Sequence, residues 1–459
     1  MSEKPSKNSE SQILDERWRK KFEAIGNVDS HLWLECKNQK EEKPKFLSGA
    51  IENPRLAYNK LDVQRLTNLK IAFSNLKQEI LAEENDPTIR EIYDWKINEK
   101  ISEVKMLLAS AHGDMPKFSE YSRAVFGAPD LQIFAHTIES LKNELALVQN
   151  STNPKLVQAA AELEKVLPRF VATEKSELEI PPPTPETFVN LRNAVRTKFK
   201  NLLEIVDEGK PKYSSEDLAE TFDKALPEIK AKDWESVLDP DKLVISIEDE
   251  KNQVSIPTGK SYLVTRVKNL LLHEIGCHIG QITGGRRSRL QLLGIGLDHN
   301  MKGFEGIATF AGSLAANPEK FEKYEELDRH LAISLGVGLD GKPRNFREVF
   351  EIMQKYYFFQ EIKARKDPET AMKNSQNKAW LRCVRTFRGS DCTTRGAIFT
   401  KDIVYSEGNI GVWDVFSKNP GLLEKIEIGR FDPTNPRHLI VLAKLQLGIS
   451  NENLAALEK

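Results

Sequence analysis

Apolar residues recur at intervals of three and four along most of the chain, and this period predicts a mainly helical protein. In a short segment near the start, Trp18 and Phe22 are spaced four apart, as on one helix face. We expect this helix to pack on the body of the protein. The pattern predicts helices over residues 13–25, 62–81, 87–111, 132–147, 154–167, 187–206 and 318–365.

A change to β-type residues precedes one helical stretch in the second half of the chain. Residues 243–247 are β-rich, the turn 249–252 follows, and 253–256 forms a plausible hairpin partner. Pro257 and Gly259 then end the hairpin. A helix over 260–279 should follow and lie beside this small sheet.

Two polar segments and a proline run divide the chain. Residues 1–12 are expected to be a disordered tail, and 37–45 a charged, loop-like connection. The run at 181–185 is a stiff break. We therefore predict an α+β fold with three parts: an N-terminal tail and short helix (1–55), a helical region (56–180) and a catalytic domain (181–459).

Composition limits the classes of function. With 67 Lys and Arg against 68 Asp and Glu, the net charge of −1 favours neither nucleic acid nor an anionic membrane as a partner. No long apolar run and no signal-like start are visible, so we expect a cytoplasmic protein. The four cysteines form no C-x-x-C pair. Cys383 and Cys392 could approach each other, but free thiols are expected in a reducing compartment.

The segment His273-Glu-Ile-Gly-Cys-His278 carries the chemistry. It resembles the zinc-peptidase signature H-E-x-x-H, but its histidines are five residues apart instead of four. In a straight α-helix this spacing separates them by about 140°. A π-bulge would return both imidazoles to one face, and Gly276 is the residue that best tolerates such a distortion.

Glu305 follows 27 positions after His278, inside Phe304-Glu-Gly-Ile-Ala. Two histidines and one glutamate, with water in a fourth position, are a known catalytic zinc set. Glu274 would then take a proton from that water and deliver it to the leaving amine. The alternative is a purely structural role, in which the histidines are a polar pair in an apolar helix and Glu305 caps another helix.

These motifs resemble the QEGLA-motif proteins of bacteria and their relatives, the microtubule-associated tyrosine carboxypeptidases. The resemblance extends to Phe399-Thr-Lys-Asp-Ile-Val-Tyr405 and covers roughly residues 55–450. It implies a zinc peptidase acting on the C-terminal tail of a peptide or protein. Three residues depart from the pattern that the resemblance implies: Cys277 stands where Thr is expected, Phe304 where Gln is expected, and Gln281 where relatives often have Arg.

Further roles are expected from the late segment. Tyr405, and second Lys401, are candidates to stabilise the tetrahedral intermediate, although Tyr405 could be a strand aromatic that packs its ring. An arginine fork suits a terminal carboxylate, and Arg385 and Arg388 are our choices for that role. The alternative for Lys401 and for each arginine is that the side chain is a solvated surface charge with no role in the site. Other arginines that could bind the terminal carboxylate are Arg382, Arg395, Arg286, Arg287 and Arg289. We expect His299 to be a surface-loop histidine and not a ligand.

Two other classes of function stay open at this point. A non-catalytic peptide or tubulin-tail binding protein could use the same scaffold, but it would have no need of Glu274. A regulatory or expression-modulating role is suggested only by the bacterial family. The residues favour a zinc carboxypeptidase. The preferred peptide and the oligomeric state are not predicted by the sequence.

Overall fold

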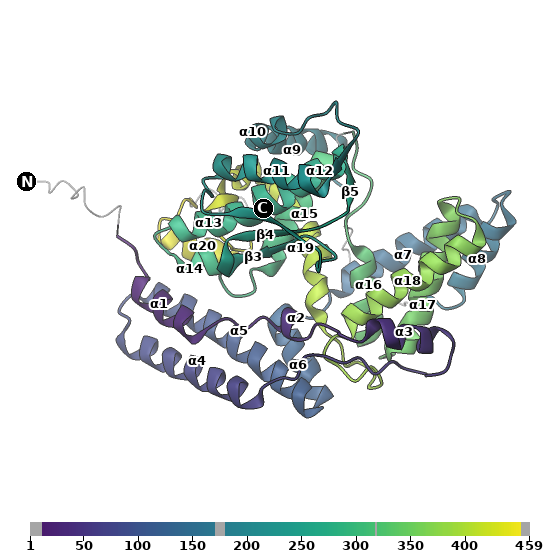
Figure 1. The fold of residues 1–459 in the computed structure, drawn as a ribbon, viewed down its shortest axis with the longest axis horizontal. Coiled ribbons are helices and arrows are strands. Elements are labelled where there is room, and N and C mark those ends of the chain that lie inside the picture. Colours follow the sequence, from purple (N-terminus) through teal and green to yellow (C-terminus); the bar gives the residue numbers. More distant parts are fainter. Residues whose placement is uncertain (1–11, 170–179, 317–318, 451–459) are drawn as a thin grey trace, which may run out of the picture.

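The computed structural model describes residues 12–169, 180–316 and 319–450, which fold mostly into helices with two small sheets (Figure 1). This arrangement agrees with the α+β class. The predicted tail lies almost wholly outside the described residues. Within those residues, no helix has both the length and the apolar character needed to cross a lipid bilayer.

The N-terminal helices form one layer, along the lower edge of Figure 1. Helix α5 is defined by its ends: Asp86 caps it by accepting from the backbone N–H groups of Thr88 and Ile89, and Gly113 ends it with a φ of 70°. Trp18 and Phe22 are buried, as their spacing predicts. The layer comprises α1 (Glu16–Ile25), α2 (Ser30–Trp33), α4 (Val63–Glu83), α5 (Pro87–His112) and α6 (Met115–Phe126).

A second group of helices lies at the right of Figure 1, and the ring of Trp380 in this group is buried. Phe46 packs against this ring and against Phe346 and Phe350, with centroids 4.8–5.5 Å apart. The group contains α3 (Gln39–Leu47), α7 (Leu131–Val148), α8 (Pro154–Glu164), α16 (Leu327–Val337), α17 (Phe346–Lys363) and α18 (Pro368–Thr386).

The remaining elements surround the sheets and carry the candidate site. The buried core that includes Leu271 and Ile307 extends from Trp18 to Ile449, so it joins both ends of the described chain. The elements are α9 (Pro185–Lys198), α10 (Lys200–Glu204), α11 (Ser215–Ala225), α12 (Val264–Leu270), η3 (Leu271–Ile279), α13 (Gly280–Arg287), α14 (Leu292–Ile295), α15 (Met301–Ala316), η4 (Thr400–Asp402), α19 (Ile403–Lys418), η5 (Pro420–Ile428) and α20 (Pro436–Lys444).

Strand β4 (Gln253–Pro257) is the centre of the larger sheet. It pairs antiparallel with β3 (Ser246–Glu248) and parallel with β2 (Glu235–Asp239). Val254 and Ile256 of β4 are fully buried. In a separate small sheet, β1 (Lys212–Ser214) pairs antiparallel with β5 (Ser261–Leu263). The predicted hairpin is therefore confirmed, and a parallel partner is added to it.

Several predicted boundaries are wrong. The charged segment 37–45 is largely helical, because α3 places Phe46 in an aromatic cluster. Leu243 and Val244 are exposed, so the first hairpin strand covers only β3. The helix expected from residue 260 starts at 264, because 261–263 pair with β1. The stretch 318–365 holds two helices, α16 and α17, and Gly338 ends the first with a φ of 85°.

Candidate metal and catalytic site

The two motif histidines lie on a π-helix. Residues Leu271–Ile279 (η3) form it between α12 and α13, and a π-helix bonds residue i to residue i+5. The rings of His273 and His278 have centroids 4.7 Å apart and lie at 87° to each other. The distorted helix predicted from the i, i+5 spacing is therefore confirmed.

Gly276 lies in the middle of η3, where the chain between α9 and α10 approaches closely. A Cβ atom at this position would lie 3.0 Å from the ring of Phe199 and 3.2 Å from Leu202. Favourable carbon contacts are about 3.5–4.0 Å. Tight packing is thus a second reason for glycine here, in addition to the tolerance of distortion expected from the sequence.

Glu305 reaches the histidine pair from helix α15. Its Oε2 atom lies 3.5 Å from Nε2 of His278 and 3.9 Å from Nε2 of His273. Among the described residues, His273, Glu274 and His278 also form a group whose potential ligand atoms all lie within 4.8 Å of one another. The structure therefore brings together all three predicted ligands and the predicted base.

The position of α15 depends on a close crossing with α19. A Cβ atom on Gly306 would lie 2.4 Å from the carbonyl carbon of Gly408. Only two glycines allow the two backbones to approach this closely. Since Glu305 is next to Gly306, the same crossing places its carboxylate beside the histidines.

The protonation states suit a metal. Burial, together with the nearby charge of His278, lowers the pKa of His273 to about 3. Burial alone would raise the pKa of Glu305, but a hydrogen bond from His278 and the charges of His278, His273 and Lys401 hold it at about 2. At neutral pH, His273 is therefore neutral and Glu305 is ionised, which are the forms that ligate metals.

The second ring nitrogens of the two histidines differ in their surroundings. His273 hydrogen-bonds to the backbone of Ala308, one turn beyond Glu305 on α15. The Nδ1 atom of His278 is buried and has no partner among the described residues. Two imidazoles and one carboxylate that meet in this way could hold a divalent transition metal.

Glu274 points into the same group and is half-buried. Burial raises its pKa, the charge of His278 opposes this and the carboxylate of Glu305 adds to it, so that the pKa lies at about 7. A general base is most effective when its pKa lies near the working pH. Glu274 therefore has the electrostatic environment of a proton carrier.

Phe304 covers one side of the site. Its ring stacks on the imidazole of His278, with centroids 4.1 Å apart and an angle of 27°. The guanidinium of Arg430 lies 4.8 Å from the centroid of the same Phe304 ring. Phe304 is thus a packing partner of a candidate ligand.

Tyr405 lies on helix α19, so the strand alternative is wrong for it. Its ring packs under the guanidinium of Arg329, 4.1 Å from the centroid. Burial raises the pKa of Tyr405, and the charge of Glu305 raises it further. The hydroxyl is therefore protonated at neutral pH and can donate a hydrogen bond.

The predicted cations have different environments. Arg385 makes a two-bond ion pair with Asp402, at 2.5 and 2.9 Å, and Arg388 contacts the ring and the carbonyl oxygen of His31. Lys401, which is half-buried, has no hydrogen-bond or ion-pair partner within the described part of the chain. Of the three, Lys401 is the cation left free for a ligand.

Sequence reasoning missed Asp402 and His31. Asp402 lies within the F-T-K-D segment, which is the sequence signal that could have identified it. Burial alone would raise the pKa of its carboxyl group, but the charge of Arg385 and a hydrogen bond from it hold the pKa well below its usual range. His31 comes from the N-terminal helix α2. Burial, together with the charge of Lys401, lowers its pKa to about 2. No pattern links this histidine to a segment hundreds of residues later.

The competing candidates pair elsewhere. Arg286 bonds to Asp249, Arg382 to Asp328, and Arg395 to Glu348. Nδ1 of His299 lies 2.9 Å from the carbonyl oxygen of Val125. Further contacts join Arg287 to the Lys230 carbonyl oxygen and Arg289 to that of Gln12. All four cysteines, Cys383 and Cys392 included, are free and buried, as expected.

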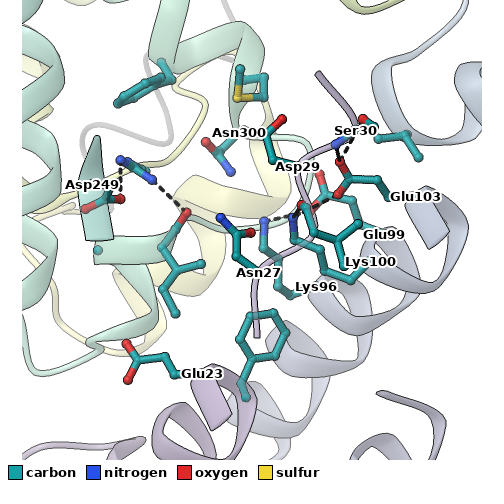
Figure 2. A pocket seen from close by; sticks show the side chains of 18 of the residues that line it. Glu23, Asn27, Asp29, Ser30, Lys96, Glu99, Lys100, Glu103, Asp249 and Asn300 are labelled. Atoms are coloured by element: carbon teal, nitrogen blue, oxygen red, sulfur yellow. Dashed lines mark hydrogen bonds and ion pairs between the residues drawn. The ribbon is translucent and has the colours of Figure 1, made fainter. Parts of the chain in front are cut away.

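A cavity of about 780 Å³ adjoins the site (Figure 2). The N-terminal segment around Asn27 forms one wall, and α5 forms another, with the ion pairs Lys96–Glu99 and Lys100–Glu103. Of its lining residues, Phe304 stacks on His278, and the charge of Lys401 acts on Glu305. The cavity thus reaches the candidate site at the ring of Phe304.

Comparison with known families gives a match. Residues 186–447, more than half of the chain, match the family model of the microtubule-associated tyrosine carboxypeptidases. The chain belongs to this family. The matched stretch contains His273, Glu274, His278 and Glu305, and membership supports a peptidase. Neither the curated proteins nor the solved structures contain a match.

Proposed function

We propose that this protein is a zinc-dependent carboxypeptidase that removes a C-terminal, tyrosine-like residue from a peptide or protein tail. The main support is that two imidazoles on the π-helix η3 converge with the carboxylate of Glu305 on α15, and that Glu274 lies beside them. Family membership supports the exopeptidase class. A cytoplasmic location and a closer kinship to the QEGLA-motif branch belong to the same proposal.

His273, His278 and Glu305 would hold the metal. The neutral His273 and the ionised Glu305 fit a cation that takes nitrogen and oxygen ligands. When bound, zinc makes a coordinated water more acidic and polarises a carbonyl group. The protein's own contribution is to fix the three ligands through η3 and α15.

Glu274 moves the proton. As water attacks the peptide carbonyl, the carboxylate of Glu274 takes a proton from the water and then passes it to the leaving amine. Tyr405 donates a hydrogen bond to the oxygen that becomes negatively charged. Its raised pKa keeps the hydroxyl proton available for this bond.

Lys401 binds the terminal carboxylate of the substrate. Its ammonium group is unpaired among the described residues, and its charge acts on Glu305. Arg385 and Arg388, the other cations proposed for substrate binding, are held by Asp402 and His31. They add positive potential behind Lys401, while Lys401 makes the direct contact.

The alternative is a non-catalytic protein that binds peptides or tubulin tails on the same scaffold. Incubating the protein with a peptide library and reading the products by mass spectrometry separates the two. We expect loss of single C-terminal residues, tyrosine above all, with one zinc per chain by metal analysis. The matched control is Glu274→Gln, which should bind peptide without cleaving it. Intact peptides after incubation with the zinc-loaded parent would favour the binding protein.

A further inference from the structure

Gln281 is a buried polar side chain without a structural explanation. It lies on α13, three residues after His278, and is fully inaccessible to solvent. Neither its amide nitrogen nor its amide oxygen has a hydrogen-bond partner among the described residues. Buried amides in native proteins are almost always satisfied, so this one needs an explanation.

A second unsatisfied group lies on η3, which runs directly into α13. The Nδ1 atom of His278 is also buried without a partner in the described residues, whereas His273 is bonded to the backbone of Ala308. Histidines that bind metals generally donate their second ring N–H to a carbonyl, carboxylate or water. Of the two histidine ligands, His278 lacks such an acceptor.

Helix geometry brings the two groups together. Residues three apart are neighbours on a helix surface, and long side chains lean back toward the helix N-terminus. From position 281, an amide that leans this way would reach over the turn that holds His278. A water between the two groups would have up to three polar partners, which is typical of buried water.

We propose that Gln281 positions the ligand His278: its amide oxygen accepts the Nδ1 proton through one buried water and so directs Nε2 toward the metal. This inference rests on the proposed zinc site.

Zinc affinity of the full chain, measured by competition with a chelator, tests the inference. Gln281→Leu keeps the apolar bulk and removes the acceptor, and we expect zinc binding 10–100-fold weaker. Gln281→Glu keeps an acceptor and should bind zinc within a few-fold of the parent. Thr283→Val is the matched control, because it removes a buried hydroxyl that bonds instead to the carbonyl oxygen of Ile279.

Metal-free stability separates a positioning role from a structural one. Replacing an unsatisfied buried amide by leucine should leave the thermal midpoint of the apoprotein equal or higher. Weaker zinc binding without loss of apoprotein stability supports the proposal. Parental zinc affinity in Gln281→Leu would overturn the role of Gln281 and leave the zinc site intact. A parent protein that takes up no zinc would overturn both.

Discussion

The crossing of α15 and α19 can be tested with a single methyl group. In Gly306→Ala, the new Cβ would lie 2.4 Å from the carbonyl carbon and oxygen of Gly408. Carbon atoms need about 3.5 Å or more, so the helices must separate by roughly 1 Å. Because the neighbouring atoms belong to the backbone, no side-chain rotation can relieve the contact.

The consequence falls on the adjacent Glu305. Metal–ligand distances tolerate only about 0.2 Å, and a 1 Å misplacement of a catalytic group costs on the order of 10²-fold in rate. We therefore expect Gly306→Ala to bind zinc much more weakly and to lose at least about 10²-fold in kcat/KM. Overpacking should also lower the free energy of unfolding by about 1–3 kcal/mol.

Gly280→Ala is the matched control. This glycine lies two residues after His278 in helical conformation, and the nearest atom to an added Cβ is 3.8 Å away. We expect parental zinc content and an equal or slightly higher thermal midpoint, since alanine favours a helix. If Gly306→Ala matches the parent in zinc affinity and rate while Gly280→Ala does too, the crossing does not position Glu305.

Other predictions address the individual residues. His273→Ala and His278→Ala should each lower zinc content well below the parent; parental content in both would refute the ligand assignment. Glu274→Gln should retain zinc but lose about 10²–10⁴-fold in turnover, and near-parental turnover would remove Glu274 from the mechanism. Amidating the substrate C-terminus should reduce the rate at low substrate about tenfold, and Lys401→Met should abolish that difference; equal cleavage of both peptides by the parent would indicate an endopeptidase.

The geometry of η3 could be predicted because it depends only on the number of residues between His273 and His278. Two like ligands five residues apart can serve one metal only if the helix is distorted between them. The helical stripes of α4 and α5 were predictable for a similar reason, since their burial follows the helix period. Such local patterns need no knowledge of distant partners.

The remaining features depend on contacts between distant segments. Helix α3 forms in a charged segment because Phe46 meets aromatic rings some 300 residues later. Arg388 finds its partner His31 at a separation of 357 positions. Because Arg385 is paired with Asp402 and Arg388 with His31, Lys401 is the cation of the three that is left without a partner among the described residues. A single sequence carries no signal for these pairings.

The anchoring of the N-terminal segment affects how the protein can be divided. The buried carboxylate of Asp15 accepts from the backbone N–H groups of Gln291 and Leu292 and from the hydroxyl of Tyr93. Ser30 donates to Glu103, and Trp18 belongs to the same core as the π-helix. The unit that folds is therefore longer than the stretch shared with the family. A fragment starting at residue 186 would expose apolar surface and leave backbone donors beside α14 unpaired, so it should aggregate where the full chain does not.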